Sequence, residues 1–576
     1  MEINNIAIPL KKSRIFLPDI FEINSWQSIE PYFKNLQQRE IKSLEDLKIW
    51  LLDRSELEAV YQENFAWRYI KMSCDTTNEE YKKSYNFFVS EIEPHISPCH
   101  NKLNEKLTLS PFVKFLDKKY AIYLREVKQE LEIFRKENIP LFTELGIEVQ
   151  KYAECIAAMT IEIGGKEITM QEAANYLKEQ NRNRREEVYS KMQHRKTQDQ
   201  EKLDRLYNQL IFLRDNIAKN ADFKNFRDYM FVAMNRFDYT VQDCYNFHDS
   251  IAAEIVPIIE TFDKERKKTL KLDKLQPWDT EVNISGQDPL KPFTNATELI
   301  DKSIECFYAI RPFFGECLET MKTMGHIDLA SRKGKAPGGY NYPLNEIGVP
   351  FIFMNSVGSL RDLVTMVHEG GHAIHSFLCR DLEITDFKNA PSEVAELASM
   401  SMELISMEHW DVFFNDAEKL KRAKREQLEK ILKILPWIAA IDKFQHWVYE
   451  NPKHSIVERT IQWRKIIEKF GSKIIDWSGN EKNLERMWQG QLHLFENPFY
   501  YIEYGMAQLG AIALWRNYKT NPEQALNAYE NALKLGHTKS ISEIYKTAGI
   551  KFDFSGPYIK ELADFVLKQY LLPAQE

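Results

Sequence analysis

Residues 368–403 read HEGGHAIHSFLCRDLEITDFKNAPSEVAELASMSME, and the expected architecture of the chain is organised around them. The stretch opens with the pattern H-E-x-x-H, in which Glu369 follows His368 and precedes His372. Residues four apart lie one turn apart on the same face of an α-helix, so both imidazoles can bind one metal ion. Glu369 then borders the same pocket and is placed to act as a base. The pattern therefore predicts a helix that carries a zinc site.

Three glutamates follow on what the sequence predicts to be a second helix. A catalytic zinc ion needs a third protein ligand and keeps a fourth position for water. Glu396 and Glu403 are seven residues apart, which is close to two helical turns, so they share a face. We take Glu396 as the third ligand and Glu403 as a hydrogen-bond partner of a ligand histidine. Glu393 is the alternative third ligand.

The residues before the histidines argue against an ordinary amphipathic helix. The apolar run PFIFMN at 350–355 is typical of a strand, Gly358 marks a turn, and residues 360–367 lead into the helix. An edge strand beside a metal-binding helix can hold an extended peptide. We therefore favour a metal site over two incidental histidines.

Composition excludes several classes of partner. The net charge of −8 over 576 residues gives no global field that favours nucleic acid or an anionic membrane. No apolar run approaches the roughly 20 residues that span a bilayer. The first five residues lack the basic and apolar regions of a secretory signal. The seven cysteines form no C-x-x-C pair, which indicates reduced thiols. We expect a cytoplasmic protein, either a monomer or a homodimer.

Helical patterns dominate the rest of the chain. The pair Gly164-Gly165 separates two short alternating runs and predicts a β-hairpin. Two helices are expected after it, at 171–193 and 199–219. Glycine and proline are dense at 331–358, which predicts turns and short strands there. A soft boundary near residue 200 divides a helical N-terminal region with a small hairpin (1–200) from the region that carries the metal pattern (201–576).

A second group of reactive side chains lies at 493–504. Peptide hydrolysis on zinc needs donors for the developing oxyanion as well as a base for the water. Tyr501 and Tyr504 are three residues apart on one helical face, and His493 precedes them. Tyrosine remains a hydrogen-bond donor at neutral pH. A helix that simply buries a row of aromatic side chains in the core would show the same spacing of tyrosines. This group alone therefore does not decide a function.

These stretches resemble a known family. HEGGHAIHSF, AELASMSME and the later PFYYIEYGMAQLG are similar to the M3 family of zinc metallopeptidases, and most of all to its oligoendopeptidase F-like branch. The resemblance covers most of the chain from about residue 110. Further matching stretches are 181–189, 236–240, 274–279 and 548–550.

The resemblance implies a fold and a set of roles. The fold would be mainly α: a large multi-helix ellipsoidal zincin with a small β element lining a deep substrate channel between the two regions. One Zn²⁺ per chain would be bound by His368, His372 and Glu396, with Glu369 as the base. The residues that match catalytic or substrate-binding positions are His493, Tyr501, Tyr504, Phe353 in the strand that pairs with substrate, Gly338, Gly339 and Tyr340, with Tyr500 as a replacement for Tyr501.

The implied function is a zinc-dependent oligoendopeptidase that hydrolyses internal bonds of short peptides through a Glu-activated zinc-bound water. A zinc carboxypeptidase of related fold is one alternative, and it would need a cation such as Arg236 or Arg332 to hold the terminal carboxylate. A catalytically inactive peptide-binding module is the other. We interpret His375 as a helix neighbour rather than a ligand, and Arg236 with Asp238 as an ion pair or a substrate clamp.

Overall fold

The computed structural model of this chain describes residues 8–336 and 338–571. The fold is 69% helix and 4% strand, which confirms the mainly α class with a small β element. The expectation drawn from the first five residues lies outside the described residues. Within the described ranges, no helix is long and apolar enough to cross a membrane.

The elements follow one another in this order. The helices before residue 270 are α1 (Trp26–Gln38), α2 (Leu44–Cys74), α3 (Glu79–Phe87), α4 (Glu93–Leu109), α5 (Ala121–Ile133), α6 (Asn138–Ala157), α7 (Met170–Tyr176), α8 (Arg182–Gln198), α9 (Gln200–Asn220), α10 (Phe226–Ala233), α11 (Val241–Glu254) and α12 (Val256–Thr269). The later helices are α13 (Ala296–Ile310), α14 (Pro312–Thr323), α15 (Leu360–Cys379), α16 (Thr385–Lys388), α17 (Ser392–Ser406), α18 (Ala417–Glu450), α19 (Ile456–Phe470), α20 (Glu481–Glu485), α21 (Leu492–Phe495), α22 (Tyr501–Thr520), α23 (Pro522–Leu533), α24 (Ile541–Thr547) and α25 (Gly556–Leu571). The strands are β1 (Thr160–Ile163), β2 (Lys166–Thr169), β3 (Ile327–Ala330), β4 (Tyr340–Tyr342) and β5 (Phe351–Ser356).

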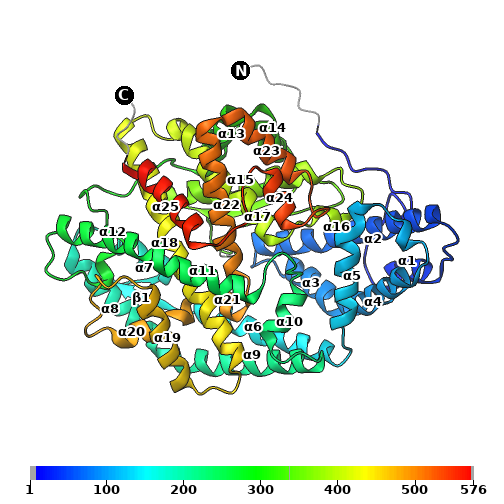
Figure 1. Cartoon of the computed structure of the whole chain (residues 1–576), viewed down its shortest axis with the longest axis horizontal. Coiled ribbons are helices and arrows are strands. Elements are labelled where there is room, and N and C mark those ends of the chain that lie inside the picture. The colour runs from blue at the N-terminus through cyan, green and yellow to red at the C-terminus, as the bar shows by residue number, and fades with distance from the viewer. Residues whose placement is uncertain (1–7, 337, 572–576) are drawn as a thin grey trace.

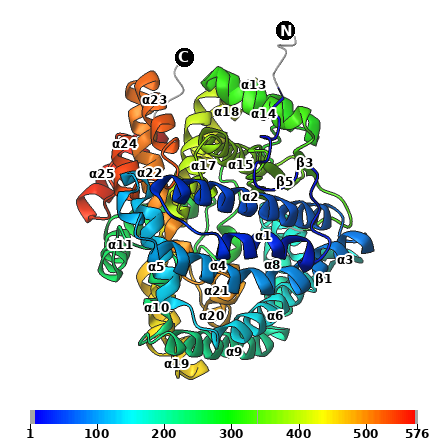
Figure 2. The ribbon, with the colours of Figure 1, turned by 90° about the vertical axis from the view of Figure 1, so that its right-hand side faces the viewer.

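Helices α15, α17 and α22 lie in the middle of the molecule, with the N-terminal helices α1 to α5 along one side (Figure 1). Figure 2 shows α2, α1 and α4 one below the other on that side. One apolar core contains residues from Ala66 to Tyr570, and a second one lies among the N-terminal helices. The large core takes residues from both sides of position 200, and the division there stays a prediction.

The hairpin expected at Gly164-Gly165 is confirmed. Strands β1 and β2 pair antiparallel, and both glycines have positive φ, as a tight two-residue turn requires. The helix expected at 171–193 is wrong, because α7 ends at Tyr176 and α8 begins at Arg182. The side chain of Asn181 accepts a hydrogen bond from the backbone of Arg184 and caps the new helix.

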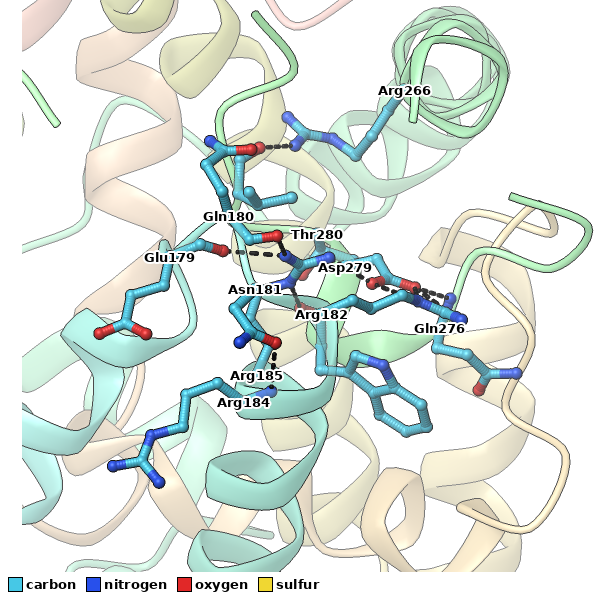
Figure 3. A network of polar contacts seen from close by, with 12 residues as sticks. Glu179, Gln180, Asn181, Arg182, Arg184, Arg185, Arg266, Gln276, Asp279 and Thr280 are labelled. Carbon is cyan, nitrogen blue, oxygen red and sulfur yellow. Dashed lines mark hydrogen bonds and ion pairs between the residues drawn. The ribbon is translucent and has the colours of Figure 1, made fainter. Parts of the chain in front are cut away.

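An ion-pair network fixes the start of α8 against the turn before residue 280 (Figure 3). Arg182 and Arg185 both donate to the completely buried carboxylate of Asp279, at 2.9 and 2.8 Å. Arg185 also donates to the backbone carbonyls of Glu179 and Gln180. A buried carboxylate needs such partners to offset its desolvation. Two of the stretches that carried the resemblance thus meet in one structural contact.

The strand expected at 350–355 forms as β5, but it is not an edge strand. The three-stranded sheet has the order β3-β5-β4, with β3 parallel and β4 antiparallel to β5. The edge strands are β3 and β4, and β4 is the one in contact with the metal-pattern helix α15. Phe353 on β5 is completely buried and stacks on Tyr340 of β4, with ring centroids 4.8 Å apart. The expected contact between Phe353 and a substrate is corrected accordingly, because its side chain supports the edge strand from behind.

The metal-pattern helix packs unusually closely on its neighbour. Helix α15 begins at a capping box in which Ser359 and Asp362 exchange hydrogen bonds. At Gly371 a Cβ atom would lie 2.6 Å from Cα of Ser399 and 2.8 Å from the carbonyl oxygen of Ala398, both on α17. Only glycine lets these two backbones approach so closely.

We expect Gly371→Ala to destabilise the protein by about 1–3 kcal/mol, because the added methyl group must push α15 away from the backbone of α17. Gly146→Ala is the matched control. Gly146 lies within α6, where a Cβ would meet nothing within 4 Å, so this change should be neutral or stabilise by up to about 1 kcal/mol. Thermal unfolding of both variants measures the difference. Equal melting temperatures would contradict the close-packing argument.

Candidate metal centre and active site

The two histidines of α15 and one glutamate of α17 converge on a single point. The ligand atoms of His368, His372 and Glu396 all lie within 4.8 Å of one another. Oε2 of Glu396 is 3.4 Å from Nε2 of His368 and 3.8 Å from Nε2 of His372. Two imidazoles and one carboxylate are a donor set that suits Zn²⁺ with an open position. The residues present therefore fit such an ion.

Glu403 holds one of these histidines in place. Its Oε1 lies 2.7 Å from Nδ1 of His368, and its Oε2 accepts a hydrogen bond of 2.7 Å from Gln427. Because Nδ1 is occupied, Nε2 of His368 is left to face Glu396. Such a carboxylate partner fixes both the ring orientation and the tautomer of a metal-binding histidine.

Glu393, the alternative ligand, has other partners. Its Oε1 accepts a hydrogen bond of 2.8 Å from Tyr239, and it is not part of the converging group. By contrast, Oε1 of Glu396 accepts from Tyr500 at 3.1 Å, and Oε2 accepts from Ser399 at 3.1 Å. The geometry thus favours Glu396 over Glu393 as the third ligand, a choice that the sequence left open.

The charges of the site act on one another. Burial raises the pKa of Glu369 to about 7; the neighbouring His368 opposes this increase and the charge of Glu396 adds to it. Burial lowers the pKa of His368, but the hydrogen bond with Glu403 and the charge of Glu396 outweigh it and raise the pKa to about 9. A divalent cation between these groups would favour the neutral imidazole and the ionised carboxylates.

A cavity of about 480 Å³ opens beside these residues. Tyr500 and Tyr504 line it, together with the metal-ligand candidates and Glu369. His493 and Tyr501 adjoin the two tyrosines: the ring of His493 is 4.9 Å from that of Tyr501 and 5.8 Å from that of Tyr504. The structure therefore brings all four aromatic side chains together, but it puts only Tyr500 and Tyr504 at the cavity wall.

The edge strand forms another wall of the cavity. Gly339, Tyr340 and Asn341 line it, and the side-chain amide of Asn341 donates to the carbonyl of Glu369 at 3.3 Å. Gly338 precedes this wall, and its carbonyl accepts from Asn355. The Gly-rich segment therefore lies beside the metal-pattern helix, and its contact with a substrate stays a prediction.

Sequence reasoning did not single out several residues of the cavity wall. They come from the end of α15 and from the connection to α17, and are Ser376, Arg380, Lys388 and Asn389. The sequence offered one indication that these residues could line the site, which is that they lie in or next to the connection between the two helices that carry the candidate ligands. His375 also lines the cavity but does not belong to the group of candidate ligands.

The two arginines considered as carboxylate anchors have structural partners. Arg236 is buried and pairs with Glu503 at 2.9 Å, and Arg332 pairs with Asp328 at 2.7 Å. Asp238 does not pair with Arg236, because its carboxylate accepts from the backbone at the start of α24. Arg236 is therefore part of a buried ion pair with a different partner from the one expected.

Comparisons with known proteins agree with this arrangement. The model of peptidase family M3 matches residues 175–564, and that of the M3 N-terminal domain matches residues 16–134. An oligoendopeptidase F homolog of Borreliella burgdorferi is 23% identical over 82% of this chain and 81% of its own length. Oligopeptidase PepF of Bacillus subtilis is 22% identical over 56% of this chain and 47% of its own length.

Solved structures extend the likeness to the whole fold. A PZ peptidase A structure with an inhibitor superimposes with a TM-score of 0.89 at 26% identity, covering 96% of this chain and 98% of the other. A putative oligoendopeptidase F from Bacillus anthracis gives 0.85 at 25% identity, covering 98% of each chain. The family model spans more than half of the sequence and includes the metal pattern and both tyrosines of the cavity wall. The chain therefore belongs to peptidase family M3 and is an oligoendopeptidase F-like member of it.

Proposed function

We propose that this peptidase is a zinc-dependent oligoendopeptidase that hydrolyses internal bonds of short peptides. The observation that carries the proposal is the convergence of His368, His372 and Glu396 within 4.8 Å, at a cavity that Glu369 also lines. These three side chains would hold one Zn²⁺. When bound, the ion would supply Lewis-acid chemistry that polarises a carbonyl and acidifies water.

Glu369 is the base in this proposal. It is one residue from His368, lines the cavity and is almost completely buried. Burial favours the proton-bearing form, so Glu369 can accept a proton from the attacking water and return it to the leaving amine. Its backbone carbonyl accepts from Asn341, which links the base to the edge strand.

Tyr500 and Tyr504 are the oxyanion donors in this proposal. Burial raises the pKa of both phenols, so each keeps its proton at neutral pH. Tyr500 already donates to Glu396 and lies beside the metal position. Tyr501 and His493 pack beside these rings and, in this proposal, act by positioning them.

The edge strand β4 is the surface that would bind the peptide backbone. Its partner β5 occupies one side, which leaves the other side of β4 for an added strand. Main-chain pairing recognises any sequence, which suits a peptidase that accepts many short peptides. The cavity of about 480 Å³ holds only a few residues, which favours a narrow, extended substrate.

One observation favours a second candidate, a zinc carboxypeptidase. Arg380 and Lys388 line the same cavity, and a cation there could hold a terminal carboxylate. Arg236 and Arg332 are already paired with carboxylates, so they do not serve this purpose. The two candidates differ in their products: internal fragments from an endopeptidase, and stepwise shortening from one end from a carboxypeptidase.

The test is a mass-spectrometric digest of a pool of peptides of mixed length. Internal fragments that disappear with a chelator and in Glu369→Gln support the proposed endopeptidase. Shortening by single residues from the carboxyl end would favour the carboxypeptidase. A pool that stays intact with zinc-loaded protein would overturn both and leave a peptide-binding module.

We expect Glu369→Gln to lower kcat by about 10²–10⁴-fold, because the amide cannot accept the proton of the water. Zinc content should remain unchanged, since Glu369 is not among the proposed ligands. Elemental analysis and steady-state kinetics on the same preparation measure both. Loss of zinc together with activity would show that Glu369 holds the metal site rather than acting as the base.

Glu396→Ala should lose about one zinc ion per chain relative to the unchanged protein, because it removes the third ligand. Glu393→Gln is the matched control on the same helix, and it should retain that ion, since its carboxylate bonds to Tyr239. Zinc content after extensive dialysis gives the comparison. The ligand assignment moves to Glu393 if only the control variant loses metal.

Tyr504→Phe and Tyr500→Phe should each lower kcat about tenfold or more, because each removes one donor near the developing oxyanion. Tyr501→Phe is the control, and it should have a smaller effect, since Tyr501 lies outside the cavity wall. Steady-state kinetics with one internally cleaved peptide compares the three variants. A larger loss in Tyr501→Phe than in the other two would reverse the assignment.

A further inference from the structure

A second cluster of metal-binding side chains lies in the core, outside the cavity. Helix α11 carries Cys244 and His248, and helix α18 carries Asp442 and His446. Each pair is spaced four residues apart, which places both of its members on one face. The two helices pack against each other, as Figure 1 also shows. All four residues are 0–1% exposed.

Three potential ligand atoms of this cluster gather close to one point. The ligand atoms of Cys244, Asp442 and His446 lie within 4.8 Å of one another, as those of the proposed catalytic ligands do. Oδ2 of Asp442 is 3.2 Å from Nε2 of His446. Two ligand atoms that each lie about 2.0–2.1 Å from a tetrahedral zinc ion are separated by about 3.3 Å. The separation of Asp442 and His446 is therefore close to that of two ligands of one ion.

Hydrogen bonds do not account for these polar atoms. Among the described residues, no hydrogen-bond partner lies beside Nδ1 or Nε2 of His446, or beside Oδ1 of Asp442. The 3.2 Å approach of Nε2 to Oδ2 is therefore a close contact without a hydrogen bond's geometry. Buried polar atoms are nearly always satisfied, so these point to a missing partner. An ion bound to both groups would provide it.

One more histidine is placed as a supporting contact. Nε2 of His248 lies 2.7 Å from Oδ2 of Asp442, at hydrogen-bond distance. Carboxylate ligands of metal sites are commonly held by such a donor. The charge also balances: a thiolate and a carboxylate neutralise a divalent cation, and the imidazoles remain neutral. A buried site without net charge avoids the cost of desolvating an isolated ion.

We propose that α11 and α18 hold a second, structural zinc ion, bound by the thiolate of Cys244, by Asp442 and by His446. The unpartnered Oδ1 of Asp442 is free to complete the coordination, and His248 orients the carboxylate. Complete burial leaves no route for a substrate, so the ion has a structural role. The ring of His446 packs on Phe499, 5.5 Å away, directly before Tyr500. The ion would thereby support the segment that carries a proposed catalytic tyrosine.

Metal content tests the proposal directly. The unchanged protein, purified with zinc, should contain about two zinc ions per chain, and Cys244→Ser should contain about one. His372→Ala should also contain about one, because it removes the catalytic ion instead. Cys306→Ser is the matched control, since Cys306 is an equally buried thiol on α13 outside the cluster, and it should keep both ions.

Cobalt substitution distinguishes the two sites by their ligands. A Co²⁺-thiolate bond gives a near-ultraviolet charge-transfer band, whereas a His₂Glu site gives none. The unchanged protein refilled with Co²⁺ should show the band, His372→Ala should retain it, and Cys244→Ser should lose it. Absence of the band from the unchanged protein, with one zinc ion per chain, would overturn the proposal and leave a buried Asp442–histidine contact.

This experiment separates the proposal from the proposed function. The band in His372→Ala would support the structural ion even if the catalytic site failed to bind metal. If the unchanged protein is active with one zinc ion per chain and its Co²⁺ form lacks the band, the proposed function holds and the structural ion is overturned. The spectrum of the unchanged protein needs no variant, so a Cys244→Ser protein that fails to fold does not obscure the result. Asp442→Asn is the second variant, and it should also reduce the zinc content by about one ion.

Discussion

The structure depends on the close contact between α15 and α17 at Gly371. The backbones of the two helices approach so closely there that a single methyl group would collide with Ser399. This contact brings His368 and His372 to Glu396, although α15 and α17 are separated by a connection of more than ten residues. A hydrogen bond between His368 of α15 and Glu403 of α17 also joins the two helices and orients the imidazole. Packing and chemistry therefore rest on the same helix pair, and a change at this interface affects both.

A second level of packing places the aromatic wall. Helix α22 lies against α17, and a Cβ at Gly510 would lie 2.8 Å from side-chain atoms of both Leu397 and Tyr545. The segment before α22 is held by Arg236, which donates to the carbonyl of Phe499 and to Glu503. Phe499 has a φ of 70°, a conformation that costs energy for a residue with a side chain. The buried arginine and the backbone bond to Gln445 stabilise it, and Tyr500 is thereby directed at Glu396.

The N-terminal helices reach the site through the connection between α15 and α17. Phe387 from this connection belongs to the N-terminal apolar core, and Thr385 donates hydrogen bonds from its backbone N–H and its hydroxyl to Ser55 of α2. Tyr340 on the edge strand bonds to Ser73, also on α2. Helix α2 therefore holds both the edge strand and the connection whose residues line the cavity. The wall of the proposed peptide site is built from segments far apart in the chain, so its shape depends on how the N-terminal layer packs.

The sequence by itself determined the local features: the helix that carries His368 and His372, the hairpin at Gly164, and the mainly α class. Each follows from spacing or turn chemistry within about ten residues, which a single chain segment contains. The seven-residue spacing of Glu396 and Glu403 also predicted that both lie on one face of the second helix. The choice between Glu396 and Glu393 needed the contact with Tyr239, and Tyr500 rather than Tyr501 faces the cavity because of the backbone at Phe499. The central position of β5, and with it the burial of Phe353, was decided by pairing with β3 and β4. Only the tertiary structure could decide these points, because each depends on contacts between residues distant in sequence.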